Sequence, residues 1–194
     1  MTIIATTATS TNAATSTGNT PTSTIVQIEQ ANEKNMVVLE LKDGGSVLIE
    51  LFEDKAPKTV ARFKELIKQG FYNGIVFHRV IDGFMAQTGD PTGTGTGGSS
   101  FPNLKAEFND VSHKRGILSM ARSSNPDSAN SQFFIVLKDS TFLDKQYTVF
   151  GKVISGMEFV DKKKKSTSTD VSGTVSNPDK IVKMSLKNPE QAKQ

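Results

Sequence analysis

The amino-acid sequence predicts a mainly β fold, either an antiparallel barrel or a sandwich, with two helices. Short strand-like runs separated by glycine-rich or polar loops make up most of the chain, and only two segments have helical spacing. Strands and helices do not alternate regularly, and this excludes a parallel Rossmann-type sheet. The 194 residues suffice for a full hydrophobic core, so we expect one globular domain.

The first predicted element is a β-hairpin. The runs MVVLELK (36–42) and SVLIELF (46–52) alternate apolar and polar residues on either side of Asp43-Gly44-Gly45, which is a strong turn signal. Because side chains alternate between the two faces of a strand, the apolar positions share one face. These positions are Val37, Leu39, Leu41, Val47, Ile49 and Leu51.

A helix is predicted next, in APKTVARFKELIKQG (56–70). Pro57 stands near its start and Gly70 follows its end, as is typical of helix termini. The residues on its apolar face are Val60, Phe63 and Ile67. This amphipathic pattern predicts that the helix covers the sheet or the core.

The rest of the chain supplies further strands and a second helix. Strands are predicted at VFHRVI (76–81), GILSMA (116–121), SQFFIVL (131–137), TVFGKV (148–153) and DKIVKMSL (179–186). The second helix is predicted in SGMEFVDKKKK (155–165). In SQFFIVL, alternation places Gln132 and Phe134 on one face and Phe133 and Ile135 on the other. We expect one face to join the core and the other to line a groove.

Composition divides the chain into a domain and two short tails. Residues 1–34 are rich in Thr, Ser and Ala, and we interpret them as a disordered extension. The first basic residue is Lys34, and Thr interrupts the apolar pairs, so a secretory signal is disfavoured. A Ser/Thr-rich transit peptide stays open as an alternative, although the segment contains no arginine. We expect a folded domain over 35–187, a polar tail over 188–194, no membrane span and a cytoplasmic location.

Composition also excludes several kinds of catalytic site. The absence of cysteine removes thiol nucleophiles, disulfides and Cys-ligated metals together. With only His78 and His113, a multi-histidine metal site is disfavoured, and neither histidine lies beside a G-x-S-x-G elbow. We therefore expect neither a metal nor a cofactor.

The charge pattern gives little support for nucleic-acid binding. The net charge is +3, but acidic and basic residues are interspersed through most of the chain. The one dense basic run, Lys162 to Lys165, is interpreted as a solvated helix end or loop. The run PTGTGTGG (91–98) lacks the Gly-Lys-Ser/Thr ending of a phosphate-binding loop and is interpreted as a flexible loop.

Arg79 is the residue most in need of a partner, because it lies inside the apolar run VFHRVI. A guanidinium keeps its charge, so placing it among apolar groups is costly unless a carboxylate or a substrate meets it. Strand alternation predicts one face with Ile75, Phe77, Arg79 and Ile81 and the opposite face with Val76, His78 and Val80. His78 is then interpreted as a packed histidine with a local hydrogen bond. Phe84, Met85 and Gln87 follow closely, so the residues alone predict a shallow apolar pocket or, equally, plain core packing.

Six blocks of the sequence, in this order, resemble the cyclophilin family of peptidyl-prolyl isomerases. They are FHRVIDGFMAQTGD, GTGTGG, LKAEFND, HKRGILSMAR, NSQFFIVL and FLDKQYTVFGKV. The resemblance extends over about Met36 to Leu186. It implies a closed eight-stranded antiparallel β-barrel capped by two α-helices, with the substrate groove on the outside of the barrel.

The resemblance also implies a site and an activity. By matching blocks, the catalytic positions fall on Arg79, Phe84 and Gln87. The positions expected to contact the substrate are Met85, Gly95, Ala121, Arg122, Gln132, Phe134, Phe142, Leu143 and Tyr147. The implied reaction is rotation about X-Pro peptide bonds, whose barrier is about 18–20 kcal/mol and which breaks no covalent bond. In the twisted transition state the proline nitrogen gains a lone pair, which Arg79 is expected to meet with a hydrogen bond.

Two positions depart from the best-known eukaryotic members and resemble bacterial ones. Phe142 stands where those members carry tryptophan, and Tyr147 where histidine is common. Loss of the indole N–H leads us to expect weak binding of the drug cyclosporin A.

The expected partners are proline-containing peptides and unfolded or flexible protein segments, met by a monomer that binds neither nucleic acid nor membrane. A rival function from another class is a proline-segment binding or chaperone module with weak catalysis on the same fold. Retention of Arg79, Phe84, Gln87 and Phe134 favours an active isomerase.

Overall fold

The computed structural model describes residues 34–167 and 172–187. The predictions of a disordered extension over 1–34 and of a polar tail over 188–194 therefore fall, apart from Lys34, outside the described residues. No helix in the described ranges is both long enough and apolar enough to cross a membrane.

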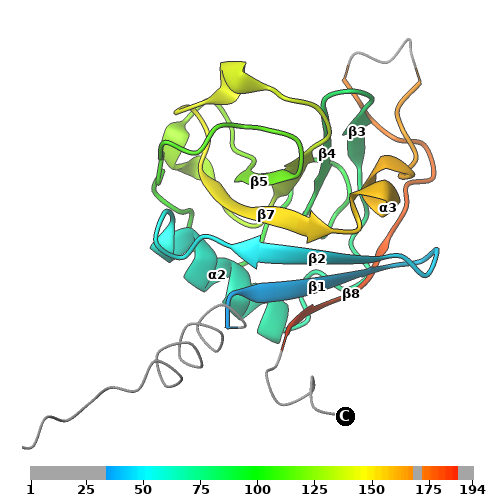
Figure 1. Ribbon diagram of the computed structural model, residues 1–194, viewed down its shortest axis with the longest axis horizontal. Coiled ribbons are helices and arrows are strands. Elements are labelled where there is room, and N and C mark those ends of the chain that lie inside the picture. The colour runs from blue at the N-terminus through cyan, green and yellow to red at the C-terminus, as the bar shows by residue number, and fades with distance from the viewer. Residues whose placement is uncertain (1–33, 168–171, 188–194) are drawn as a thin grey trace, which may run out of the picture.

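Over the described residues the fold is mainly β, with one eight-stranded antiparallel sheet and two α-helices. In chain order the strands are β1 (Met36–Leu41), β2 (Ser46–Leu51), β3 (Arg79–Ile81), β4 (Met85–Thr88), β5 (Ile117–Met120), β6 (Phe133–Val136), β7 (Val149–Ser155) and β8 (Ile181–Leu186). Their order across the sheet is β3-β4-β6-β5-β7-β2-β1-β8. The helices are α2 (Pro57–Lys68) and α3 (Met157–Asp161), with short 3₁₀ turns η1 (Pro126–Ser128) and η2 (Thr141–Leu143). Figure 1 shows the sheet strongly curled, with α2 and α3 toward different sides of it.

The hairpin of β1 and β2 forms as predicted. Gly44 has a φ of +78°, and the Gly45 N–H donates to the Asp43 carboxylate at 3.2 Å, so the Asp-Gly-Gly sequence closes the turn. Val37 lies opposite Ile49 and Leu39 opposite Val47. All the apolar positions predicted for this face are buried, each at most 3% exposed.

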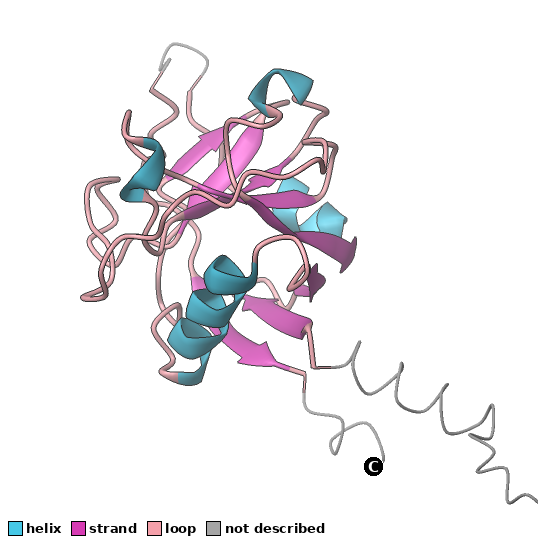
Figure 2. Cartoon of the chain, turned by 90° about the vertical axis from the view of Figure 1, so that its left-hand side faces the viewer, coloured by secondary structure: helices cyan, strands magenta, loops and turns pink. Residues whose placement is uncertain are grey.

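Helix α2 packs its predicted face into the core, where Val60, Phe63 and Ile67 are buried. Figure 2 shows it alongside the curled sheet. Its N-cap residue, Ala56, supplies no side-chain hydrogen bond. The carboxylate of Glu107 replaces the missing cap, because it accepts from the backbone N–H groups at positions 58 and 59 at 3.0 and 2.8 Å. A residue from a distant loop thus accepts hydrogen bonds from the free N–H groups of the first helical turn. It also places a negative charge at the positive end of the helix dipole.

The predicted strand 76–81 is shorter than expected, and its alternation is wrong. Only β3 forms a regular strand, whereas Phe77 and Val80 are both fully buried and His78 and Arg79 face the same cavity. The backbone explains the difference, because Phe77 N–H donates to Asp179 O and Val80 N–H donates to Gly173 O. Residues 77–80 thus pair with the irregular segment 173–179, and this pairing interrupts the two-residue alternation of side chains.

The lysine run after α3 is held locally rather than free. Lys163 is 3% exposed and its Nζ lies 3.3 Å from the Asp43 carboxylate, so the prediction of a solvated side chain is wrong at this position. Lys162 lies over the Phe159 ring and Lys165 pairs with Asp82. Lys164 donates to the carbonyl of residue 177. Lys162, Lys164 and Lys165 are exposed, and each of them has a local contact.

Candidate active site

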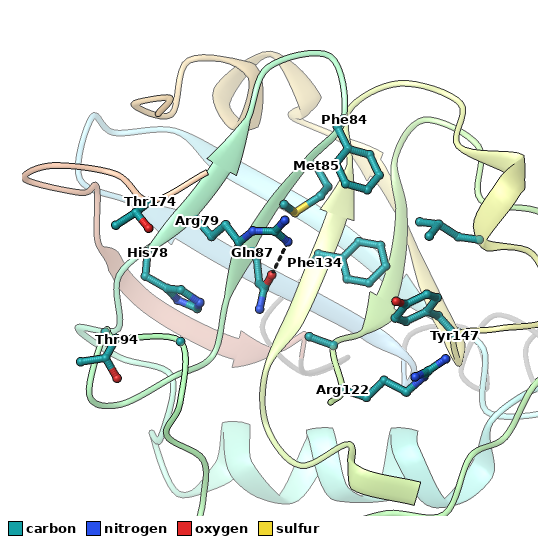
Figure 3. Close-up of a pocket in the computed structure, with 14 residues that line it drawn as sticks. His78, Arg79, Phe84, Met85, Gln87, Thr94, Arg122, Phe134, Tyr147 and Thr174 are labelled. Carbon is teal, nitrogen blue, oxygen red and sulfur yellow. Dashed lines mark hydrogen bonds between the residues drawn. The ribbon is translucent and has the colours of Figure 1, made fainter. Parts of the chain in front are cut away.

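A cavity of about 340 Å³ brings together most of the residues that the sequence singled out (Figure 3). The predicted residues that line it are Arg79, Phe84, Met85, Gln87, Gly95, Ala121, Arg122, Phe134, Leu143 and Tyr147. They come from β3, the turn after it, β4, β6 and η2, and from the loops that follow Asp90, β5 and η2. Strand register accounts for the centre of the site, because Arg79 lies opposite Gln87, and Gln87 lies opposite Phe134.

Two predicted residues lie beside this cavity and not in its lining. Gln132 lines a second cavity of about 570 Å³. The residues shared by both cavities are Gln87, Gly95, Ala121 and Arg122. Phe142 lines neither cavity, but its ring centroid lies 5.7 Å from that of Phe84, and it is 66% exposed.

The floor of the first cavity is apolar and belongs to a small hydrophobic cluster separate from the main core. Met85, Phe134 and Leu143 are buried in this cluster, and Phe84 and Tyr147 pack against it. Met85 lies on β4, Phe134 on β6 and Leu143 at the end of η2. Phe84 and Tyr147 lie in a turn and a bend. The arrangement provides an apolar surface beside Arg79, in a cavity with room for a small ring.

Arg79 stands at the edge of this floor, about half buried, with its guanidinium in the cavity (Figure 3). Its Nε–H donates to Ser172 O at 2.7 Å, and its Nη1 donates to Gln87 Oε1 at 3.2 Å. In the described residues no carboxylate lies within ion-pair distance of it. Burial lowers the pKa of Arg79, while Tyr147 acts in the opposite direction. Neutral oxygens therefore orient the guanidinium without neutralising its charge.

A chain of amide hydrogen bonds continues from Arg79 along the groove. Gln87 Nε2 donates to Gln132 Oε1 at 2.9 Å, and Gln132 Nε2 donates to the carbonyl oxygens of Gly95 and Gly97 at 3.0 and 2.8 Å. Each amide uses its oxygen toward Arg79 and its nitrogen away from it, so the chain has one direction. It links the guanidinium to the glycine-rich loop on the far side of the groove.

That loop is organised by Asp90, which is fully buried. Its carboxylate accepts from the backbone N–H groups of Thr92, Gly95 and Gly97 at 2.8, 2.6 and 3.1 Å, and from the Thr92 hydroxyl. Burial opposes ionisation, but these bonds outweigh it and lower the pKa of Asp90 to about 2. A Cβ atom on Gly97 would lie 2.2 Å from Asp90 Oδ1, so only glycine fits there. The run 91–98 is a loop, as predicted, and the bonds to Asp90 give it a defined conformation.

His78 also lines the cavity, and the sequence did not assign it there. It is 6% exposed, as expected of a packed histidine. Neither ring nitrogen makes a hydrogen bond of good geometry among the described residues, and the backbone of Val76 is the local polar group that interacts with the ring. Burial lowers the pKa of His78, and Asp90 acts in the opposite direction. The nearby residues Val76 and Val80 predicted a histidine packed in the core, and not one that lines a cavity. Gly93, Thr94 and Thr174 are further lining residues that carried no signal.

Ser119, His113 and Asp144 form a hydrogen-bonded row with the pattern of a hydrolase triad. His113 Nδ1 lies 2.9 Å from Asp144 Oδ1, and His113 Nε2 lies 3.0 Å from Ser119 Oγ. Ser119 and His113 are fully buried, and neither lines a cavity described above, so no substrate reaches the serine. The His113 ring instead stacks on Phe134 at 6.2 Å, which makes the row a support behind the cavity floor.

Groups of side chains that could bind a metal were also sought in the described residues. Within the described ranges, no three His, Cys, Asp or Glu side chains come together in a group that could hold an ion.

Comparison with known proteins agrees with this geometry. Residues 36–186 match the family model described as cyclophilin type peptidyl-prolyl cis-trans isomerase/CLD. A probable peptidyl-prolyl cis-trans isomerase of Brucella suis is 53% identical over 167 residues, which cover 80% of this chain and 84% of that protein. Peptidyl-prolyl cis-trans isomerase B of Bacillus subtilis is 48% identical over 120 residues, covering 61% and 83%.

A solved structure has the same fold. It is a cyclophilin type peptidyl-prolyl cis-trans isomerase of Cryptosporidium parvum, determined in the presence of the dipeptide Ala-Pro. It superposes with a TM-score of 0.70 at 32% identity, over 79% of this chain and 99% of that one. The ordered sequence blocks, the curled antiparallel sheet and these matches lead to one conclusion, that the chain belongs to the cyclophilin family and is a peptidyl-prolyl cis-trans isomerase.

Proposed function

We propose that the cavity around Arg79 is the active site, in which the chain rotates X-Pro bonds of flexible protein segments. The observation that carries the proposal is a guanidinium without a carboxylate partner, fixed by Gln87 at the edge of an apolar floor. The pyrrolidine ring of the substrate packs on Phe134, Met85 and Leu143. One side of the bond is thereby anchored while the other side turns.

In this proposal Arg79 acts chiefly on the transition state. A planar amide nitrogen shares its lone pair with the carbonyl group, and rotation returns that lone pair to the nitrogen. An N–H of Arg79 then donates to it, which lowers the barrier because the bond is stronger in the twisted state than in the ground state. The donor is oriented in advance by Ser172 O and Gln87, so little reorganisation is needed during the reaction.

The amide chain and the loop have supporting roles. Gln87 holds the guanidinium, and Gln132 joins it to the carbonyl oxygens of Gly95 and Gly97. The substrate backbone next to the proline lies along Ala121 and Arg122, where the second cavity begins. The solved Cryptosporidium structure obtained in the presence of Ala-Pro supports a proline-containing peptide as the ligand.

The experiment that tests the proposed site combines kinetics with mapping. Magnetisation exchange on a short X-Pro peptide measures the acceleration, and amide shifts of the labelled protein are followed during titration with Ala-Pro and with Ala-Ala. We expect Ala-Pro to shift the amides of Gly95, Ala121 and Phe134 and to leave those of α2 in place, and Ala-Ala to have little effect. Acceleration of exchange with shifts confined to another face would contradict the site while leaving the activity intact.

We also infer that the curled sheet closes into a barrel. The edge strands are β3 and β8 in the strand order. The segment before β3 is bonded to the segment before β8, since Phe77 N–H donates to Asp179 O and Ile181 N–H donates to Ile75 O. An isolated bridge joins Val76 to Lys180. These bonds support a closed wall that continues beyond the regular strands.

Weak binding of cyclosporin A is the expected consequence of Phe142, and Phe142→Trp is expected to tighten it. Phe142 is exposed beside Phe84, where an indole N–H would be free to donate to a ligand carbonyl. One added hydrogen bond corresponds to about a three- to tenfold lower Kd. Titration of both proteins with the drug, followed by fluorescence or calorimetry, measures the change. Equal affinity of the two proteins would refute this account of position 142.

A further inference from the structure

Arg122 stands where the two cavities meet. It lines both of them, together with Gln87, Gly95 and Ala121. A peptide that passes from one cavity into the other therefore runs beside this side chain. With the proline ring on the proposed apolar floor, this position sets Arg122 beside the residues that adjoin the proline.

The groove has a one-sided charge. Arg79 and Arg122 are the two Lys or Arg residues in the linings of the two cavities, and the linings contain no Asp or Glu among the described residues. The second cavity is otherwise lined by glycines, Ala121 and neutral polar side chains. These side chains are Gln87, Thr96, Ser99, Asn103, Ser123, Ser128, Asn130 and Gln132. The lining thus carries two positive charges and no negative one, with the ionised carboxylate of Asp90 behind the glycine-rich loop.

The guanidinium of Arg122 is held in place. Its Nε and Nη2 donate to Gln146 O at 3.1 and 2.8 Å, and its Nη1 donates to Ser123 O at 2.9 Å. Its central carbon lies 4.5 Å above the Tyr147 ring. These partners are neutral, and no carboxylate in the described residues forms an ion pair with it. The charge is thus fixed and uncompensated, and these three bonds leave N–H groups of the guanidinium for a further acceptor.

We propose that Arg122 is a specificity-determining residue that selects X-Pro segments carrying an Asp or Glu side chain close to the proline. The proposal rests on the proposed active site, because the groove must be the path of the peptide. A carboxylate gains a charge-assisted hydrogen bond from a donor whose orientation is already fixed. A lysine at the same position of the peptide would instead meet the like charges of Arg79 and Arg122, with no acidic residue in the lining. Long-range attraction also brings acidic segments to the groove faster.

The test uses peptides that differ at one residue. Glu, its neutral isostere Gln, or Lys is placed in turn at each of the two positions before the proline and at the one after it. The kcat/KM of the full chain is measured for each peptide by magnetisation exchange at low and at high salt. At one or more positions we expect Glu to exceed Lys by about three- to tenfold, with Gln between them. The ratio should shrink at high salt, because salt screens the attraction.

Charge reversal separates recognition from structure. Arg122→Glu is expected to invert the order of kcat/KM, so that the Lys peptide exceeds the Glu peptide. Arg122→Gln is expected to bring the kcat/KM values of the Glu and Lys peptides close together. Arg62→Glu is a matched control, because Arg62 likewise lies over a ring, that of Phe101, and donates to Pro102 O, but lines neither cavity. It should keep the wild-type order.

The proposal is overturned if wild type treats Glu, Gln and Lys alike at every position. It is also overturned if Arg122→Glu and Arg122→Gln lower all three rates by the same factor, which is the outcome expected of a purely structural residue. In both cases the isomerase activity itself stands. A wild type that accelerates none of the peptides would instead contradict the proposed function and the preference together.

Discussion

Arg79→Ala is expected to lose most of the isomerase activity, with kcat/KM falling by about 10²- to 10³-fold. The reason is that the Arg79 guanidinium lies at the edge of the apolar floor, and its bond to the proline nitrogen forms in the transition state. Magnetisation exchange on an X-Pro peptide at equilibrium measures the loss. Because substrate anchoring depends mainly on the floor, we expect the loss in kcat rather than in KM.

Two controls make the Arg79 result specific. Arg79→Lys keeps a positive charge but lacks the planar fork that bonds Ser172 O and Gln87 together, so we expect it to recover only a small part of the rate. Circular dichroism and thermal unfolding must show that both variants are folded. If folded Arg79→Ala accelerates exchange as wild type does, the transition-state role is wrong. If wild type binds the peptide without accelerating exchange, the rival reading as a binding or chaperone module takes over.

Asp90→Asn is expected to destabilise the fold by about 2 kcal/mol or more at neutral pH and to weaken substrate binding. The carboxylate of Asp90 serves three backbone N–H groups of the glycine-rich loop, and an amide offers one oxygen to them and points an N–H at the rest. A pKa lowered from 3.8 to about 2 in a fully buried group corresponds to a contribution of about that size. Urea unfolding of the variant beside wild type measures it.

The pH dependence of this difference distinguishes the carboxylate from general packing. Since the folded pKa of Asp90 lies below its unfolded value, its contribution is complete above about pH 4 and is lost as the pH falls toward 2. The gap in stability between wild type and Asp90→Asn should therefore narrow over this range. Asp110→Asn is the control, because Asp110 is an exposed partner of Lys55 and its loss should cost little at any pH. A gap that is the same at pH 7 and at pH 2.5 would refute the charge-based account.

The elements that the sequence predicted well are those whose signals are local. The hairpin has its turn in three consecutive residues, and α2 has Pro57, Gly70 and an apolar face within one segment. β4 was not predicted as a strand, because Met85, Ala86 and Thr88 are all buried beside Gln87 and give no two-residue alternation. The error over 75–81 has the same origin, since the irregular segment before β8 sets the faces of that stretch.

The candidate site was predictable as a set of positions and not as a network. The sequence blocks placed Arg79, Phe84, Gln87 and Phe134 in one site, and the structure brings them into one cavity. The contacts that fix the site join residues far apart in the chain. Arg79 and Ser172 are 93 residues apart, and Gln132 and Gly95 are 37 apart. Spacing carries no information on such pairs, and the same holds for the position of His78 and the stacking of Arg122.

The order of the strands has a consequence for how the chain reaches its folded state. β1 and β2 are made first, yet β1 pairs with β8 and β2 with β7, which are the last strands along the chain. Until β7 and β8 have been synthesised, both outer edges of the hairpin have unpaired N–H and C=O groups, which can pair with a strand of another chain. During synthesis on the ribosome, the first hairpin must therefore wait with open edges, and a chain broken before Ile181 would keep one of them exposed to aggregation.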